Sequence, residues 1–337
     1  MPASSRNDVE PVRPRGVTLP YRALVTLELP PEVQAVFDAS YRVDYAPDFV
    51  FGAPDAAARI AGHDVLVVSA IKDRLDAGTI RALPDSVRAI ATYSIGHEHV
   101  DLAAARARGI AVFATPDVLS DAVAEVGMLL LLGAARRVTE SVALLRSGRW
   151  TGWTPTQLNG TGLAGKVLGI VGMGRIGRAV ARRARAFGMA IHYTNRSRLD
   201  AQREDGATHH ADPGDLLRVA QFLLLACPAT PETTGFLDAR RIALLPRGAI
   251  VANVGRGAVV VDADLADALV SGHVAAAGLD VFDGEPAVCR RYFDLPNVFM
   301  LPHIGSSTIE TRVAMAHLLV DGLRQYAQGR DAANRIA

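Results

Sequence analysis

The chain has 337 residues, which is long enough for two domains with sizeable hydrophobic cores. Its 36 Lys and Arg nearly balance its 35 Asp and Glu, so the composition gives no indication of a nucleic-acid partner. The most apolar stretch, residues 126–135, is far shorter than a membrane span of roughly 20 residues, so we expect no membrane insertion. The two cysteines, Cys227 and Cys289, favour a reducing cytoplasm, and residues 1–18 are expected to be a disordered tail without a signal peptide.

Short apolar runs alternate with helical patterns along the chain, which predicts an α/β fold with largely parallel sheets. Early strands are expected at residues 23–26, 65–69, 89–92 and 111–113. One long helix is expected over residues 120–146, with its N-cap at Ser120, and a loop rich in Gly, Thr and Trp follows it. Later strands are expected at residues 167–171, 189–193, 222–226, 249–253, 276–281 and 298–301, before a final helix over residues 307–328.

A glycine motif follows the strand at residues 167–171 and opens a helical pattern. Gly172 allows a tight turn, Gly174 lets the backbone approach a diphosphate, and Gly177 lets the helix pack close to the strand. The helix N-terminus also favours phosphate. A purely structural turn is the alternative, which the strand–turn–helix context disfavours. We therefore expect a dinucleotide site at Gly172, Gly174, Arg175, Ile176 and Gly177.

The four residues that follow the next strand, Asn195, Arg196, Ser197 and Arg198, indicate which dinucleotide binds. An NAD site usually has Asp or Glu at this place to hold the ribose 2′-OH. Guanidinium and hydroxyl groups can instead bind a 2′-phosphate through charge-assisted hydrogen bonds. We expect NADP(H) to be preferred and NAD(H) to be possible, the alternative being an ordinary solvated basic loop.

Three polar side chains follow later strands, namely Arg256, Glu285 and His303. Strands of one parallel sheet end at a common edge, so these groups are expected in one crevice. Arg offers a planar fork for the carboxylate and carbonyl of a 2-oxo acid, and His can exchange a proton with the carbonyl oxygen. Singly, each fits a turn, a solvated loop or packing, but together they predict a hydride-transfer site in which Glu285 orients His303 and favours its charged form.

These motifs resemble those of the D-isomer-specific 2-hydroxyacid dehydrogenase family over nearly the whole chain. The matching blocks are residues 169–177, 227–233, 253–257, 278–286 and 301–306. The resemblance implies two Rossmann-like, doubly wound parallel-sheet domains with an active-site cleft between them. We expect a substrate domain of residues 19–114 and 305–337, and a dinucleotide-binding domain of residues 115–304.

The resemblance also implies roles for individual residues. Arg256 would clamp the substrate, His303 would act as acid and base, and Glu285 would be its partner. Asp280 would contact the nicotinamide carboxamide. Independently of the resemblance, Cys227 precedes Pro228 at a strand end, so we expect its side chain to pack there and its carbonyl to face the cofactor. Backbone amides at Ser94, Ile95 and Gly96 would bind the substrate carboxylate.

Within the family, the chain is most similar to NADPH-preferring glyoxylate/hydroxypyruvate reductases, through residues 150–153 and 195–198. Residues 97–99 (His-Glu-His) and 289–291 (Cys-Arg-Arg) depart from the family pattern and leave the substrate range open. An NAD-preferring dehydrogenase of another 2-hydroxy acid and a redox-sensing, non-enzymatic relative are the alternatives. Formate dehydrogenases pair the acid/base His with Gln, so Glu285 argues against that activity.

The helix over residues 120–146 and the loop after it look too apolar to be exposed on a monomer, so we expect a homodimer. The family resemblance implies that Trp153 in this loop can reach the neighbouring subunit's site and restrict it to small substrates. Packing at the interface is the alternative role for Trp153. His209 and His210 suggest a metal pair, but adjacent residues on a strand point to opposite faces, so we expect a solvent-exposed loop and no metal site.

Overall fold

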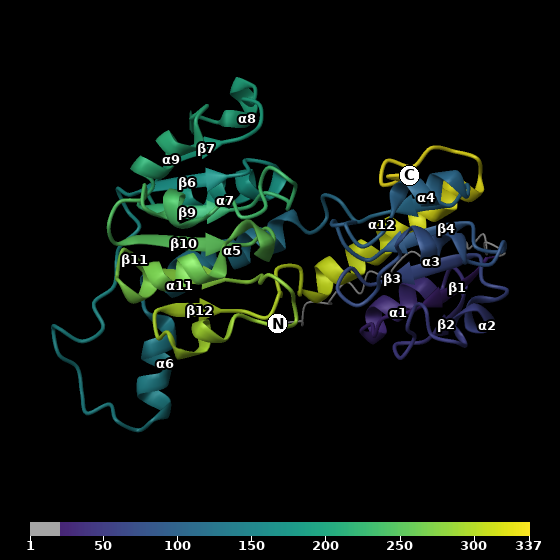
Figure 1. The fold of residues 1–337 in the computed structure, drawn as a ribbon, viewed down its shortest axis with the longest axis horizontal. Helices are drawn as coiled ribbons and strands as arrows, with labels where there is room; N and C mark the ends of the chain where they lie inside the picture. The colour runs from purple at the N-terminus through teal and green to yellow at the C-terminus, as the bar shows by residue number, and fades with distance from the viewer. Residues whose placement is uncertain (1–20) are drawn as a thin grey trace, which may run out of the picture. The chain divides into compact units, whose positions relative to one another are not determined.

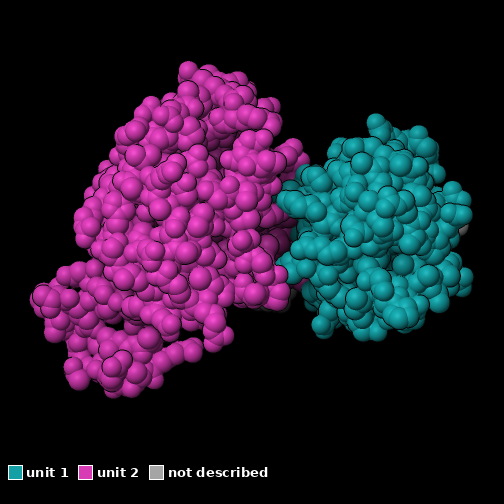
Figure 2. All heavy atoms as spheres, viewed as in Figure 1, with its two compact units in different colours: residues 1–116, 312–337 teal, residues 117–311 magenta. Residues whose placement is uncertain are grey.

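The computed structural model of the protein describes residues 21–337 (Figure 1). The expected tail over residues 1–18 lies outside the described residues. The chain forms two compact units: unit 1 comprises residues up to 116 together with 312–337, and unit 2 comprises residues 117–311 (Figure 2). Residues 305–311, expected in the substrate domain, belong to unit 2, where the Gly305 N–H donates to the Asp280 carboxylate at 2.8 Å. Residues 115–116, expected in the dinucleotide-binding domain, belong to unit 1.

Unit 1 contains a five-stranded parallel sheet in the order β2-β1-β3-β4-β5. This is one of the common doubly wound strand orders. Strands β3 and β4 of this sheet are buried along their whole length, as expected for a parallel sheet covered on both faces. The elements are β1 (Arg22–Val25), α1 (Pro31–Asp38), β2 (Arg42–Tyr45), α2 (Ala56–Ile60), β3 (Val65–Val68), α3 (Ala77–Arg81), β4 (Ala89–Thr92), α4 (Leu102–Ala107), β5 (Ala111–Phe113) and most of α12 (Ile309–Ala327).

Unit 2 contains a seven-stranded parallel sheet in the order β12-β11-β10-β9-β6-β7-β8. Counted along the chain, this is the Rossmann order 3-2-1-4-5-6 with a seventh strand added. The elements are α5 (Ser120–Ala135), α6 (Val138–Arg146), β6 (Val167–Val171), α7 (Arg175–Ala186), β7 (Ala190–Thr194), α8 (Ala201–Glu204), β8 (Thr208–His209), α9 (Pro213–Val219), β9 (Phe222–Leu225), α10 (Ala239–Ile242), β10 (Ala249–Asn253), α11 (Asp262–Val270), β11 (Val274–Leu279) and β12 (Val298–Met300). The predicted architecture of two parallel-sheet α/β domains is thereby confirmed.

The register of the unit 2 sheet brings the ends of five strands level with one another. Val171, Leu225, Asn253, Leu279 and Met300 are each paired with the next across β6, β9, β10, β11 and β12. The loops that follow these strands therefore start from the same edge of the sheet. The topological switch point, where ligands bind in open α/β sheets, lies between β6 and β9 on this edge.

The prediction of one long helix over residues 120–146 is wrong, because the segment forms two helices, α5 and α6. Arg137 adopts a left-handed conformation at φ 54° and forms a bidentate ion pair with Glu140, at 2.8 and 2.7 Å. Neither Gly nor Pro marks this break, so the sequence carries no residue that would predict a helix end here. The predicted N-cap is also wrong, because Ser120 is the first helical residue and Leu119 occupies the cap position.

The apolar side chains of α5 pack inside unit 2, which corrects the expectation that this helix is too apolar for a monomer. The helix packs on β10, β11 and α7. A Cβ on Gly278 of β11 would lie 2.6 Å from the Leu130 carbonyl oxygen, so helix and sheet are in direct backbone contact. By contrast, α6 has no buried residue, and in Figure 1 it extends from unit 2 together with the loop after it.

The structure also adds two short strands that the sequence analysis misses. β2 is a partly exposed edge strand with Arg and Asp in it, and β8 has only two residues. Neither carries the apolar run by which the other strands are recognised. In the described part of the chain, no helix combines the length and hydrophobicity needed to cross a bilayer.

Leu130 and Leu129 offer a matched test of how α5 packs. Leu130 is fully buried, whereas its neighbour Leu129 is 45% exposed. We expect Leu130→Ala to destabilise unit 2 by about 2–5 kcal/mol, because it removes buried methyl groups and leaves a cavity. Leu129→Ala should lower the free energy of unfolding by clearly less, because Leu129 is already partly exposed to water. Urea unfolding followed by near-UV circular dichroism measures both, and equal losses would contradict the packing described.

Candidate active site

His303 and Glu285 form a hydrogen-bonded pair beyond the ends of β12 and β11. His303 Nδ1 lies 2.7 Å from Glu285 Oε2, and Glu285 Oε1 accepts the Phe282 N–H, also at 2.7 Å. Both carboxylate oxygens are therefore engaged. One binds the imidazole, and the other is bound by a backbone N–H that fixes the orientation of the carboxylate. His303 itself has a φ of 54°, a conformation that is uncommon for a residue other than glycine. The pairing expected from the sequence is present.

The electrostatics keep the Glu285 carboxylate ionised. Burial acts to raise its pKa, but the hydrogen bonds from His303 and Phe282, with the nearby charges of His303 and Arg256, lower it overall. The Arg256 guanidinium therefore lies near enough to Glu285 for its positive charge to act on the carboxylate.

Arg256 follows β10 in a loop that packs directly on the loop leading to Glu285. A Cβ on Gly257 would lie 1.8 Å from the Phe282 carbonyl carbon, so no larger residue fits there. The Arg256 side chain donates to the Gly255 carbonyl at 2.8 Å. Arg256, Glu285 and His303 are thus brought to one edge of unit 2.

Asp280 has a role in this site that the sequence does not reveal. It is almost completely buried at the end of β11, and it accepts the N–H groups of Ile304 and Gly305, both at 2.8 Å. Burial raises the pKa of Asp280 despite these bonds. The carboxylate thereby anchors the backbone that follows His303. The contact of Asp280 with a nicotinamide carboxamide stays a prediction.

The glycine turn after β6 has the geometry that a dinucleotide diphosphate requires. Gly172 has a φ of 97°, and a Cβ on it would lie 2.8 Å from the Ala226 carbonyl carbon and the Cys227 nitrogen. A Cβ on Gly177 would lie 2.3 Å from the Gly172 oxygen. Gly174, the residue before α7, faces open space, with no atom within 4 Å of an added Cβ. The turn is tight on two sides and open at the helix N-terminus, where a diphosphate would be held.

Other predicted cofactor residues surround this turn. Arg175 forms an ion pair with Asp117, and half-buried Ile176 follows it in the first turn of α7. Cys227 is buried in the loop after β9, and burial raises the pKa of its thiol to about 11. A thiol in this state packs as a small apolar group, as expected.

The residues after β7 divide into two groups. Asn195 Oδ1 accepts the Met173 N–H at 2.7 Å and ties the loop to the glycine turn. Arg196 and Ser197 are exposed. Arg198 is also exposed, but it is bound to Glu204, with Nε–Oε1 and Nη2–Oε2 distances of 2.7 and 3.0 Å. The sequence gives no sign of this partner.

The predicted carboxylate-binding residues Ser94, Ile95 and Gly96 lie in unit 1, in the loop after β4. The Ser94 hydroxyl donates to the Gly96 carbonyl, which folds the loop back on itself. His97 is exposed, whereas His99 is buried and its Nε2 lies 3.0 Å from Thr92 Oγ1. Of these two histidines, His97 is therefore the one at the surface.

Two other histidines of unit 2, His192 and His210, contact each other. His210 Nε2 lies 2.9 Å from His192 Nδ1, and the Tyr193 and His209 rings are in contact, with centroids 5.0 Å apart. His209 and His210 are both half-buried, which corrects the expected solvent-exposed loop. Within residues 21–337, no cluster of three or more His, Cys, Asp or Glu side chains could hold a metal ion.

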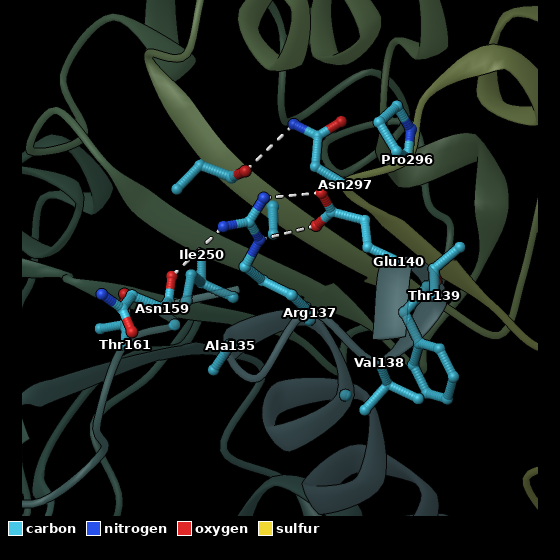
Figure 3. Close-up of a pocket in the computed structure, with 16 residues that line it drawn as sticks. Ala135, Arg137, Val138, Thr139, Glu140, Asn159, Thr161, Ile250, Pro296 and Asn297 are labelled. Carbon is cyan, nitrogen blue, oxygen red and sulfur yellow. Dashed lines mark hydrogen bonds and ion pairs between the residues drawn. The ribbon is translucent and has the colours of Figure 1, made fainter. Parts of the chain in front are cut away.

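A separate hollow of about 260 Å³ lies at the other end of the unit 2 strands (Figure 3). Its lining includes Ile250 near the start of β10 and Asn297 before β12, together with the Arg137–Glu140 ion pair. The groups described above follow the opposite ends of these strands, so this hollow is not part of the candidate active site.

The loop after α6 carries two exposed indoles, with Trp150 51% and Trp153 78% exposed.

Comparisons with known proteins agree with this geometry. The family model described as "D-isomer specific 2-hydroxyacid dehydrogenase, NAD binding domain" matches residues 128–305. A glycerate dehydrogenase of Hyphomicrobium methylovorum is 39% identical over 319 residues, which are 94% of this chain and 99% of that protein. A solved structure from Polaromonas sp. JS6 66, described as a D-isomer specific 2-hydroxyacid dehydrogenase, is 46% identical, with a TM-score of 0.90 over 95% of this chain and 100% of its own.

A second solved structure carries a cofactor in its description. It is an NADPH-dependent glyoxylate/hydroxypyruvate reductase of Sinorhizobium meliloti in complex with NADP and malonate. It is 33% identical, with a TM-score of 0.82 over 94% of this chain and 97% of its own. The family model spans more than half of the chain, from within α5 to the loop after β12. The chain therefore belongs to the D-isomer-specific 2-hydroxyacid dehydrogenases, a family of oxidoreductases that use a nicotinamide dinucleotide.

Proposed function

We propose that the protein is an NADPH-preferring reductase of small 2-oxo acids, which converts glyoxylate to glycolate and hydroxypyruvate to D-glycerate. The observation that carries this proposal is the His303–Glu285 pair, at 2.7 Å, with Arg256 close to it. The names of its relatives, a glycerate dehydrogenase and a glyoxylate/hydroxypyruvate reductase, support the substrate class. Glu285 engages His303 Nδ1, so Nε2 is the nitrogen that can meet a substrate.

In the proposed reaction, a reduced nicotinamide supplies the hydride that adds to the carbonyl carbon. His303 Nε2 donates a proton to the carbonyl oxygen, and Glu285 keeps the ring oriented and charged until that proton leaves. Arg256 binds the substrate through its planar fork, and the amides of Ser94, Ile95 and Gly96 bind the carboxylate. One hydride and one proton thus convert the 2-oxo acid into a 2-hydroxy acid.

The dinucleotide would be held by the glycine turn and by the residues after β7. The diphosphate would lie at Gly174 and the first turn of α7, where the backbone N–H groups lack partners within the helix. Arg196 and Ser197, both exposed, would bind the 2′-phosphate. This part of the proposal distinguishes the protein from an NAD-preferring dehydrogenase, the main alternative.

Proton transfer by His303 can be tested through the pH dependence of reduction. His303→Ala should lower kcat by roughly 10²–10⁴-fold, the usual contribution of a general acid. Reduction should fail at high pH as the imidazolium deprotonates. Glu285→Gln removes the negative charge that favours the imidazolium, so it should move this alkaline limb to lower pH. Steady-state kinetics of glyoxylate reduction across pH measures the limb, and an unmoved limb in Glu285→Gln would refute the pairing.

Cofactor preference can be tested at Arg196. Arg196→Ala should raise the KM for NADPH by roughly ten- to a hundredfold, because it removes a hydrogen bond between two charged groups. The KM for NADH should stay nearly unchanged. Arg240→Ala is the control, since Arg240 is an exposed arginine on α10. Equal effects of Arg196→Ala on both cofactors would mean that Arg196 does not recognise the 2′-phosphate, and absent turnover with every 2-oxo acid would favour a non-enzymatic role.

We also propose that the protein is a homodimer whose contact surface includes α6 and the loop after it. Val142 and Leu145 on α6, and Trp150 and Trp153 after it, are large apolar side chains that are between 42% and 78% exposed. Such a concentration of exposed apolar groups is typical of an interaction surface. A closed two-fold dimer is the commonest way to cover it. Trp153 would then limit the neighbouring subunit's site to small substrates.

Trp153→Ala tests the two roles of this indole separately. If Trp153 restricts the substrate, the variant should remain dimeric and reduce larger 2-oxo acids, such as branched ones, with a higher kcat/KM. Light scattering gives the oligomeric state, and kinetics on a panel of 2-oxo acids gives the substrate profile. A dimeric variant with an unaltered profile would limit Trp153 to interface packing, and a monomeric wild-type protein would overturn the dimer.

A further inference from the structure

We propose that Glu204 is a positioning residue for cofactor selection, which holds the Arg198 guanidinium so that its other N–H groups can bind the 2′-phosphate of NADP(H). The proposal rests on the NADPH preference proposed above and adds the residue that makes Arg198 effective. Glu204 is the last residue of α8, several positions beyond the loop that carries Arg196 and Ser197. It touches no cofactor itself in this proposal.

The Glu204 carboxylate is unusually buried for a charged group, with its side chain only 9% exposed. It accepts three hydrogen bonds: from the Tyr193 hydroxyl at 2.6 Å, and from Arg198 Nε and Nη2 at 2.7 and 3.0 Å. The bonds from Arg198 and then Tyr193 lower its pKa to about 2, against the opposing effect of burial. At neutral pH the group is therefore an ionised carboxylate that is fully committed to this network.

The same network fixes the loop between β7 and α8. Tyr193 is fully buried, and its oxygen accepts the Leu199 N–H at 3.0 Å while its hydroxyl donates to Glu204. At the start of the loop, Asn195 Oδ1 accepts the Met173 N–H from the glycine turn. Arg198 thus lies between two anchored points, on a loop that is bonded to the place where the diphosphate would lie.

Arg198 is anchored but not hidden. Its side chain remains 67% exposed although two of its nitrogens are bound to Glu204. A guanidinium has five N–H groups, so the bidentate pair leaves others available for a phosphate. Holding the side chain in advance reduces the conformational entropy that it loses on binding. The Glu204 carboxylate, bound to Arg198, would therefore strengthen phosphate binding. An Asp or Glu that contacted the ribose, as in an NAD site, would instead repel the 2′-phosphate.

Binding of two adenosine phosphates by isothermal titration calorimetry tests this role without turnover. The probes are adenosine 2′,5′-bisphosphate, which carries the 2′-phosphate, and 5′-AMP, which lacks it. The proteins are the wild type, Glu204→Gln, Arg198→Ala and the double variant, with Arg240→Ala as the control. We expect each single variant to weaken binding of the bisphosphate by roughly ten- to a hundredfold, equivalent to one charge-assisted hydrogen bond, and to leave 5′-AMP binding unchanged.

The double variant should lose no more than Arg198→Ala alone, because Glu204 acts only through Arg198. Tighter bisphosphate binding by Glu204→Gln would overturn the proposal, since it would mean that Glu204 withholds Arg198 from the phosphate. Arg198 is exposed, so Arg198→Ala keeps the test valid if Glu204→Gln does not fold. Unchanged bisphosphate binding by Arg198→Ala would also overturn the proposal. A wild type that binds both probes equally would refute the NADPH preference and this inference with it. An undiminished preference for the bisphosphate in Glu204→Gln would refute the role of Glu204 alone.

Discussion

The parallel register of the unit 2 sheet is the constraint on which the site depends. Because Val171, Leu225, Asn253, Leu279 and Met300 lie level across five strands, every loop that follows them begins at one edge. The glycine turn and the three polar side chains all occupy such loops and not the strands themselves. Backbone hydrogen bonds therefore determine where the chemistry occurs, while the loop sequences determine what it is.

Buried and half-buried carboxylates then fix the loops. Asp280 holds the backbone after His303, Glu285 holds the imidazole, and Glu204 holds Arg198, and each uses both of its oxygens. Removing a carboxylate from water is costly, so a buried one persists only where hydrogen bonds replace its hydration. Once formed, such bonds are strong and directional, and they hold flexible loops with a precision that apolar packing alone does not supply.

The strands of buried apolar residues and the glycine motif were predictable, because their patterns follow directly from burial and backbone geometry. Arg256, Glu285 and His303 were predictable for a related reason, since residues at strand ends inherit their place from the sheet. The break at Arg137 was not, because an arginine in a left-handed conformation carries no local signal and depends on Glu140. The anchoring roles of Asp280 and Glu204 were also hidden, because each depends on a partner that only the tertiary structure identifies.

The catalytic geometry and the choice of substrate have different physical origins. In the proposed reaction, Arg256 and His303 would address a carboxylate and a carbonyl, and these two groups are common to every 2-oxo acid. Discrimination between glyoxylate and a larger 2-oxo acid must come from groups that meet the rest of the molecule. His97 in unit 1 and Trp153 after α6 are exposed, and neither belongs to the edge of unit 2 that carries Glu285. They can therefore vary without disturbing the hydrogen bonds around Glu285. Substrate range can therefore diverge within this family while proton and hydride transfer stay the same.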